Sequence, residues 1–124
     1  MLPNFLLEES TVRESGESLA FDLDDHSSDN LLLTLGITHA VEQESIDVEI
    51  VGSHDGETWS PKPLASFTQK FYCGTYQTIL PRSSYKYVKA IWRMHRWARG
   101  GSRPFFRFYL FVQPARARAL AGAA

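Results

Sequence analysis

Apolar and polar residues alternate with a period of two in several short segments, and this pattern restricts the chain to strand-based folds. Ile46, Val48 and Ile50 alternate with Asp47 and Glu49. Successive side chains of a strand point to opposite faces, so this alternation is typical of a strand with one buried face. The same pattern, or an apolar run of strand length, recurs at residues 18–23, 31–37, 74–80, 87–95 and 105–112, and residues 5–12 are compatible with an edge strand.

Turn-forming residues separate these segments. The 46–51 segment ends at Gly52-Ser-His-Asp-Gly56, which carries the Asp-Gly signal of a tight turn. A polar stretch at 24–30, the sequence Pro81-Arg-Ser-Ser84 and the Gly-rich 99–104 segment predict further loops. No segment shows the period of a helix. We therefore expect an all-β fold, an antiparallel sandwich or barrel of seven or eight strands.

The length of 124 residues predicts one domain, which we place at 1–113, followed by an Ala/Arg-rich tail at 114–124. The first residues lack the positive charge of a secretory signal, and no stretch approaches the about 20 apolar residues of a membrane span. The lone cysteine, Cys73, fits a reducing compartment. We expect a cytoplasmic protein without a cofactor.

The charges are divided between the two halves of the chain. All fourteen acidic residues lie between Glu8 and Glu57, whereas twelve of the thirteen basic residues lie between Lys62 and Arg118. Such a division is compatible with a charged partner. It also arises when strands from the two halves pair, and we favour this interpretation: Lys89 and Arg93 are then expected to neutralise acidic residues on neighbouring strands.

One segment resembles a known family. The sequence Ile46-Asp-Val-Glu-Ile-Val-Gly-Ser-His-Asp-Gly-Glu-Thr-Trp59 contains Ser-x-Asp-Gly-x-x-Trp after a strand. It is similar to a corner of discoidin (coagulation factor 5/8 C-type) domains, which are galactose-binding-like β-sandwiches. Tyr87-Val-Lys-Ala-Ile-Trp92, Trp97 and Arg107-Phe-Tyr-Leu-Phe111 resemble later parts of that family. The resemblance covers 46–112 and implies a jelly-roll sandwich, but no ligand residue is carried over from it.

Two groups of residues are candidate ligand sites. Asp55 and Gly56 are expected to form the turn, with Trp59 packed over its base; alternatively, an exposed Trp59 with His54 and Asp55 makes a platform for a sugar. The second group is the basic residues at 86–107, which alternate with aromatic residues as in single-strand nucleic-acid binders. There the best candidate anion site is Arg96, Arg99 and Arg103, beside Gly100 and Gly101. Nucleic acid is the alternative that we favour less.

The chain carries no recognisable catalytic or metal-binding motif. Its four histidines lack the close spacing of metal ligands, and we expect neither enzyme activity nor a bound metal. The final segment is apolar on both faces, so we expect Phe105, Tyr109 and Phe111 to be covered by a second subunit. The sequence predicts a non-catalytic binding or assembly module that forms a homo-oligomer and has a carbohydrate or another protein as its partner.

Overall fold

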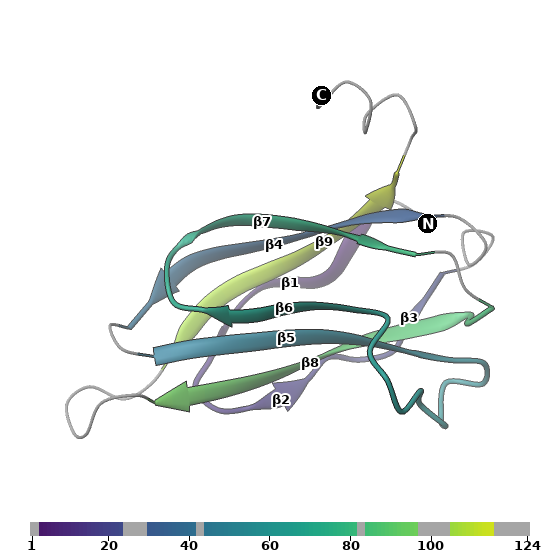
Figure 1. Ribbon diagram of the computed structural model, residues 1–124, viewed down its shortest axis with the longest axis horizontal. Coiled ribbons are helices and arrows are strands. Elements are labelled where there is room, and N and C mark those ends of the chain that lie inside the picture. Colours follow the sequence, from purple (N-terminus) through teal and green to yellow (C-terminus); the bar gives the residue numbers. More distant parts are fainter. Residues whose placement is uncertain (1–2, 24–29, 42–43, 82–83, 97–104, 116–124) are drawn as a thin grey trace.

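The computed structural model describes residues 3–23, 30–41, 44–81, 84–96 and 105–115, and within them the fold is a sandwich of two antiparallel β-sheets (Figure 1). Sheet A has the strand order β1-β9-β4-β7, with β1 at Asn4–Val12, β9 at Phe106–Pro114, β4 at Leu31–Ala40 and β7 at Gly74–Leu80. Sheet B has the order β2-β8-β5-β6, with β2 at Gly16–Glu17, β8 at Tyr87–Arg96, β5 at Glu44–Ser53 and β6 at Ala65–Lys70. The short β3, Phe21–Asp22, also pairs with β8.

The core lies between the two sheets and is built from the alternating residues that the sequence pattern indicated. On β9 the inward row is fully buried and consists of Phe106, Phe108, Leu110 and Val112. On β8 the inward row is Val88, Ala90 and Trp92, and on β5 it is Ile46, Val48 and Ile50. The ring of Trp92 stands edge to face on Phe108, with 5.6 Å between centroids, and so joins the two layers.

The all-β prediction is confirmed, and strand β7 has the predicted bounds of 74–80. The prediction of a regular strand at 18–23 is wrong, because only Phe21–Asp22 pairs there and Leu19 is 89% exposed. Ser18 explains the interruption: its backbone N–H donates to Ala90 O (2.8 Å), and its hydroxyl accepts from Ala90 N–H (2.9 Å). The serine side chain takes the place of a ladder partner, so Leu19 is free to face solvent.

Ion pairs between the two halves of the chain confirm the predicted neutralisation within a sheet. Arg93 on β8 pairs with Glu49 on β5 (3.0 Å), and His95 lies 3.2 Å from Asp47. Lys89 pairs instead with Glu17 on β2 (3.1 Å), because the register places Val51 opposite it on β5. The charge division thus serves, at least in part, to pair strands, although each exposed pair contributes only about 0–1 kcal/mol.

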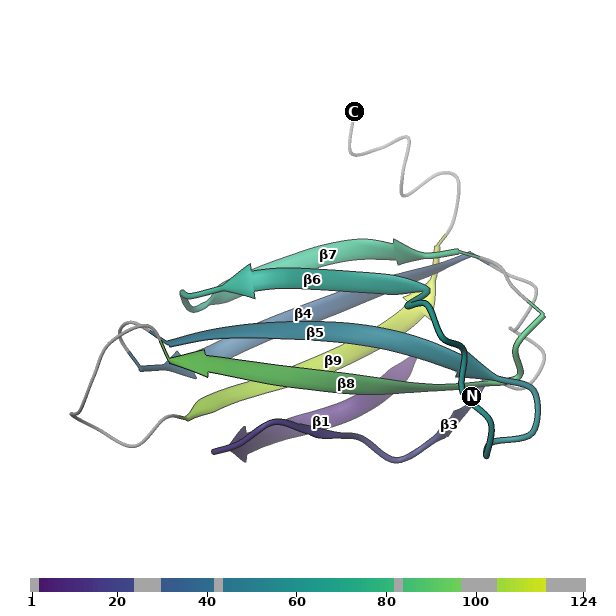
Figure 2. The same ribbon diagram turned by 60° about the horizontal axis from the view of Figure 1, so that its bottom comes forward.

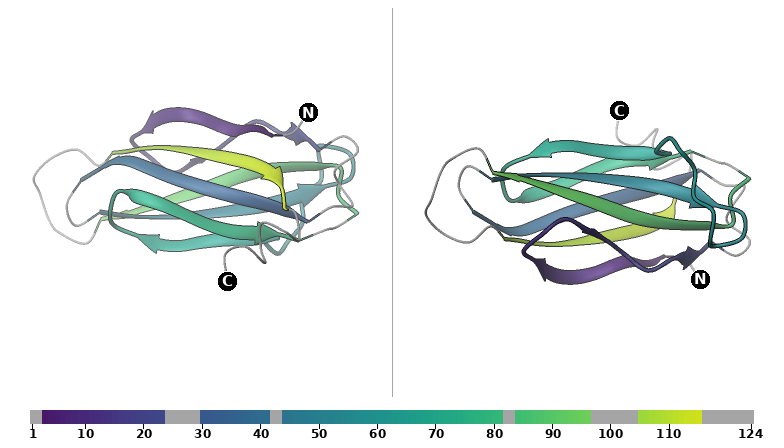
Figure 3. Two further views of the ribbon diagram at one scale, coloured as in Figure 1. Left: turned by 90° about the horizontal axis from the view of Figure 1, so that it is seen from above. Right: turned by 90° about the horizontal axis from the view of Figure 1, so that it is seen from below.

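The two long sides of the sandwich differ. Strands β6 and β7, which follow one another in the chain, form the edges of both sheets along one side (Figure 2). Strand β1 lies along the opposite side (Figure 3). The described residues contain no helix long and apolar enough to cross a membrane.

Candidate functional site: a groove on the outer face of sheet A

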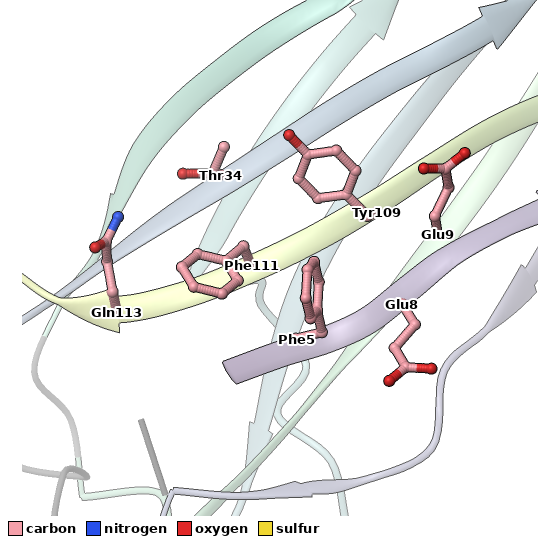
Figure 4. A pocket seen from close by; sticks show the side chains of 7 residues that line it. All are labelled: Phe5, Glu8, Glu9, Thr34, Tyr109, Phe111 and Gln113. Atoms are coloured by element: carbon pink, nitrogen blue, oxygen red, sulfur yellow. The ribbon is translucent and has the colours of Figure 1, made fainter. Parts of the chain in front are cut away.

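The outer face of sheet A, which faces away from the core, contains a groove of about 560 Å³ (Figure 4). Its residues come from three adjacent strands that lie far apart in the sequence. The lining consists of Phe5, Glu8 and Glu9 from β1, Thr34 from β4, and Tyr109, Phe111 and Gln113 from β9. We call this feature the sheet A groove. Its volume lies within the about 300–1,000 Å³ that is usual for ligand sites.

Two β-bulges in β1 place two acidic residues of this strand in the groove. The register between β1 and β9 shifts between Phe5 and Leu7 and again between Leu7 and Ser10, so β1 gains one residue at each place. Such bulges let two successive side chains lie on one face of a sheet. Leu6 and Leu7 therefore both pack inward, whereas Glu8 and Glu9 both line the groove on the outer face.

An aromatic floor depends on a glycine. Gly36 on β4 lies opposite Tyr109 on β9, and a Cβ at position 36 would be only 2.2 Å from the Tyr109 ring. The tyrosine ring therefore lies over the glycine backbone. Phe5 stands on edge against the rings of Tyr109 and Phe111, with centroid distances of 5.9 and 5.0 Å and interplanar angles of 82° and 67° (Figure 4). Phe5 therefore contacts both of the other rings in the edge-to-face geometry that aromatic pairs favour.

Polar groups surround these rings. The Thr34 hydroxyl accepts a hydrogen bond from the Gln77 amide (3.2 Å), although the threonine is buried. The carboxylate of Glu9 is held by the Arg107 guanidinium and by the Thr38 hydroxyl, which donates to it over 3.3 Å. None of the seven lining residues is basic. The groove therefore combines aromatic surface with hydroxyl, amide and carboxylate groups that can exchange hydrogen bonds with a neutral ligand.

The three residues predicted to form an oligomer interface are separated in the structure. Tyr109 and Phe111 are half-buried and lie in the sheet A groove. Phe105 lies just before β9, where its ring is 6.5 Å from that of His39 and 5.6 Å from the Arg13 guanidinium. Phe105 therefore does not line the groove, although strand alternation keeps it on the same outer face as Tyr109 and Phe111.

The predicted sugar platform is a smaller hollow at the corner after β5. His54, Asp55 and Trp59 do come together there, around about 220 Å³. The Asp55 carboxylate accepts hydrogen bonds from the backbone N–H groups of Thr58 (2.9 Å) and Glu57 (2.8 Å), and these are the main reasons that its pKa falls from 3.8 to about 2. The carboxylate is thus engaged in holding the turn, as the structural interpretation of this motif predicted.

Trp59 is likewise engaged with its own chain. The Lys89 ammonium lies 4.4 Å from the centre of its ring, and the backbone of Trp59 forms an isolated antiparallel β-bridge with Ser53 of β5. The His54 ring stacks on Tyr85 at 4.6 Å. Because the cation occupies the tryptophan ring, this hollow offers less free aromatic surface than the sheet A groove.

The predicted anion site falls largely outside the part of the chain that the structure describes. Arg99 and Arg103 lie in 97–104, which is not described, and Arg96 ends strand β8 with a side chain that is not described either. Among the described residues, no three histidine, cysteine or acidic side chains gather as a metal ion would require.

Sequence reasoning missed most of the groove. Five of its seven residues were not candidates, because none of them belongs to a recognisable motif: Phe5, Glu8, Glu9, Thr34 and Gln113. Two signals were present: the doubled pairs Leu6-Leu7 and Glu8-Glu9, which break the alternation of a regular strand, and Gly36 inside an otherwise apolar strand. The doubled pairs coincide with the two bulges of β1, and Gly36 is the residue over which the Tyr109 ring lies.

No family model, no curated protein and no solved structure matches this chain. The resemblance to discoidin domains therefore stays a prediction.

Proposed function

We propose that this protein is a non-catalytic binding module whose sheet A groove holds a neutral carbohydrate. One observation carries the proposal: an open groove of about 560 Å³ in which Phe5 packs on edge against Tyr109 and Phe111, among hydroxyl, amide and carboxylate groups. A sugar ring has apolar C–H faces and a rim of hydroxyls. The faces pack on aromatic rings, and the hydroxyls need fixed donors and acceptors.

The polar groups of the groove fit this class of ligand. The Glu9 carboxylate accepts hydrogen bonds only, and its position is set by Arg107 and Thr38. The Gln113 amide can both donate and accept, as a sugar hydroxyl can. A hydroxyl-bearing ligand therefore meets a partner of either kind without bringing a charge into the groove.

The charge of the lining disfavours anionic ligands. Phosphate-bearing ligands are bound by lysine and arginine, whereas the charged side chains that line this groove are Glu8 and Glu9. A cationic peptide would meet complementary charge there, so it is the main competitor to a neutral sugar and belongs among the probes of the experiment.

Binding is tested with an array of neutral oligosaccharides, followed by calorimetric titration of the full chain with the best probe. A lysine-rich peptide and a single-stranded oligothymidylate serve as competing probes. Phe111→Ala removes one ring of the groove, and Trp59→Ala is the matched control in the corner hollow. We expect Phe111→Ala to weaken sugar binding at least tenfold and Trp59→Ala to leave it within a factor of two, with both variants folded by circular dichroism.

The proposal fails if no oligosaccharide binds at millimolar concentration, or if Phe111→Ala binds as well as the unchanged protein. Loss of binding in Trp59→Ala alone would move the site to the corner hollow. Binding of the peptide or the oligothymidylate in place of a sugar would assign another class of ligand.

A finer assignment of the fold belongs to the same proposal. We propose a jelly-roll sandwich of the galactose-binding-like kind, supported by the Ser53–Trp59 corner, in which Asp55 holds the turn and Trp59 packs beside β5. A cytoplasmic location, which the lone Cys73 favours, is part of the proposal as well.

A further inference from the structure

The edge strands of the two sheets differ in how they are protected from pairing with another chain. An edge strand presents unpaired backbone N–H and C=O groups, and proteins block such edges with charges, bulges, proline or very short strands. Strand β1 carries Glu8 and Glu9 and two register shifts. Strand β6 ends in Lys70 and has a register shift, and β2 and β3 are two residues long. Three of the edges are therefore blocked.

Strand β7 itself carries none of these protections, and no other described strand pairs with its outer edge. Its sequence, Gly-Thr-Tyr-Gln-Thr-Ile-Leu, contains no charge and no proline. Its register with β4 is continuous from Gly74, opposite Ile37, to Leu80, opposite Leu31. Threonine, tyrosine and isoleucine favour extended structure. The strand thus offers an edge of continuous register and no charged residue of its own, along the side of the molecule that it shares with β6 (Figure 3); the nearest charge is the Lys70 ammonium of β6, which lies 4.6 Å from the centre of the Tyr76 ring.

From this contrast we infer that β7 pairs antiparallel with β7 of a second copy of this chain. A two-fold axis at Gln77, the middle residue of β7, allows all seven residues of the strand to pair. Gln77 then faces its own counterpart, Thr75 faces Ile79, and Tyr76 faces Thr78 of the second copy. On the outer face this register places no charge opposite a charge, and it joins the two four-stranded sheets A into one sheet of eight strands.

The hairpin that leads into β7 supports a partner at this edge. Tyr72 is 78% exposed, and its backbone oxygen accepts a hydrogen bond from the Tyr76 hydroxyl (2.9 Å), which ties the hairpin to the strand. A large exposed aromatic side chain beside an unprotected strand is typical of an interface. The proposed pairing brings Cys73 opposite Pro81 of the second copy, so that Tyr72 lies against the end of the partner strand.

The pairing has a consequence that rests on the proposed function. An axis perpendicular to the sheet keeps both sheet A grooves on the same face. The two β9 strands are then five strand spacings apart, about 24 Å at about 4.8 Å each. A polymer long enough to reach both grooves would bind more tightly than a short oligosaccharide.

The first test is the mass of the full chain, measured by light scattering after size exclusion over a range of concentrations. We expect a dimer. The double variant Thr75→Lys/Gln77→Lys places four positive charges at the proposed contact, and we expect the dimer dissociation constant to rise at least tenfold. The matched control is Ser66→Lys/Thr68→Lys on β6, which makes the same change at the same spacing on the other edge; its dissociation constant should stay within a factor of two.

The second test examines the register and does not depend on a destabilising change. In a Cys73→Ser background, Gln77→Cys places two thiols across the axis, where opposite Cβ atoms are about 4.5–5.5 Å apart and a disulfide needs only a small adjustment. We expect mild oxidation to give a covalent dimer. Ser66→Cys in the same background, and the unchanged protein with Cys73, should give none.

A monomer at the highest concentration reached would overturn the inference. So would a dimer that resists Thr75→Lys/Gln77→Lys but is broken by Phe111→Asp, because the contact would then lie on the face of sheet A. Absence of the Gln77→Cys cross-link in a dimeric protein excludes the proposed register. None of these results depends on whether a sugar binds in the groove, which the titration decides separately.

Discussion

The substitution Gly36→Ala provides the most direct test of how the aromatic floor is built. The backbone of Gly36 lies outside the positive-φ region, so alanine fits the local conformation. The obstacle is the Tyr109 ring, because the new Cβ would lie 2.2 Å from two of its ring carbons and 2.5 Å from its hydroxyl oxygen. A real Cβ contact requires at least 3.0 Å, so the ring must move.

The size of the effect follows from that clash. Forcing an extra methyl group into a packed position costs about 1–3 kcal/mol. When Tyr109→Ala has already removed the ring, the same Gly36→Ala change should cost nothing, or even stabilise by about 0.5–1 kcal/mol, because alanine restricts the unfolded chain. The difference between the two backgrounds is the coupling between the substitutions, which we expect to be about 1–4 kcal/mol.

Urea unfolding followed by tryptophan fluorescence measures this coupling in four proteins: the unchanged chain, the two single variants and the double variant. Gly52→Ala is the control, since its Cβ would meet Tyr85 at 2.6 Å and has no contact with Tyr109. Its cost should be the same with and without Tyr109. If Gly36→Ala were equally costly in both backgrounds, the ring would not be the cause and the account of the groove floor would be wrong.

Three further substitutions test other parts of the structure. Phe108→Ala removes a fully buried ring that contacts Trp92, and urea unfolding should show a loss of about 3–5 kcal/mol. The pKa of Asp55 is lowered from 3.8 to about 2, so the stability that its charged form contributes is present above about pH 4 and is lost as the pH falls toward 2. The melting temperatures of the unchanged protein and of Asp55→Asn should therefore converge between about pH 4 and about pH 2, and their difference should stay constant above about pH 4. Lys89→Ala removes the cation over Trp59 and should cost about 0.5–1 kcal/mol in urea, with a change in tryptophan emission.

Local sequence pattern predicted the strands wherever one face of a strand is buried and the other is wet. Residues 74–80 became β7 with the predicted bounds, and the inward row of β9 lies in the core as its alternation indicated. The pattern was misleading at Leu19, where a serine hydroxyl replaces a ladder hydrogen bond. Alternation reports only the chemistry of neighbouring residues, so it does not detect a side chain that substitutes for a backbone partner.

The division of charge along the chain also shows what the sequence predicts and what only strand pairing decides. The sequence showed that acids and bases occupy separate halves, and strand pairing was the favoured reason. The pair Arg93–Glu49 has this origin. The partner of Lys89 was not predictable, because it depends on the register of β8 against two neighbours, and a shift of one residue would have changed it.

The sequence by itself determined the long strands and which of their faces are apolar, because the two faces of a strand are distinguished by a period of two in the chain. Only the tertiary structure decided that Phe5, Thr34 and Tyr109 lie together, since three strands from distant parts of the chain had to become neighbours in one sheet. It also decided which strand would lie unprotected at an edge. Both outcomes depend on the choice of strand partners, which is a property of long-range packing and not of any local pattern.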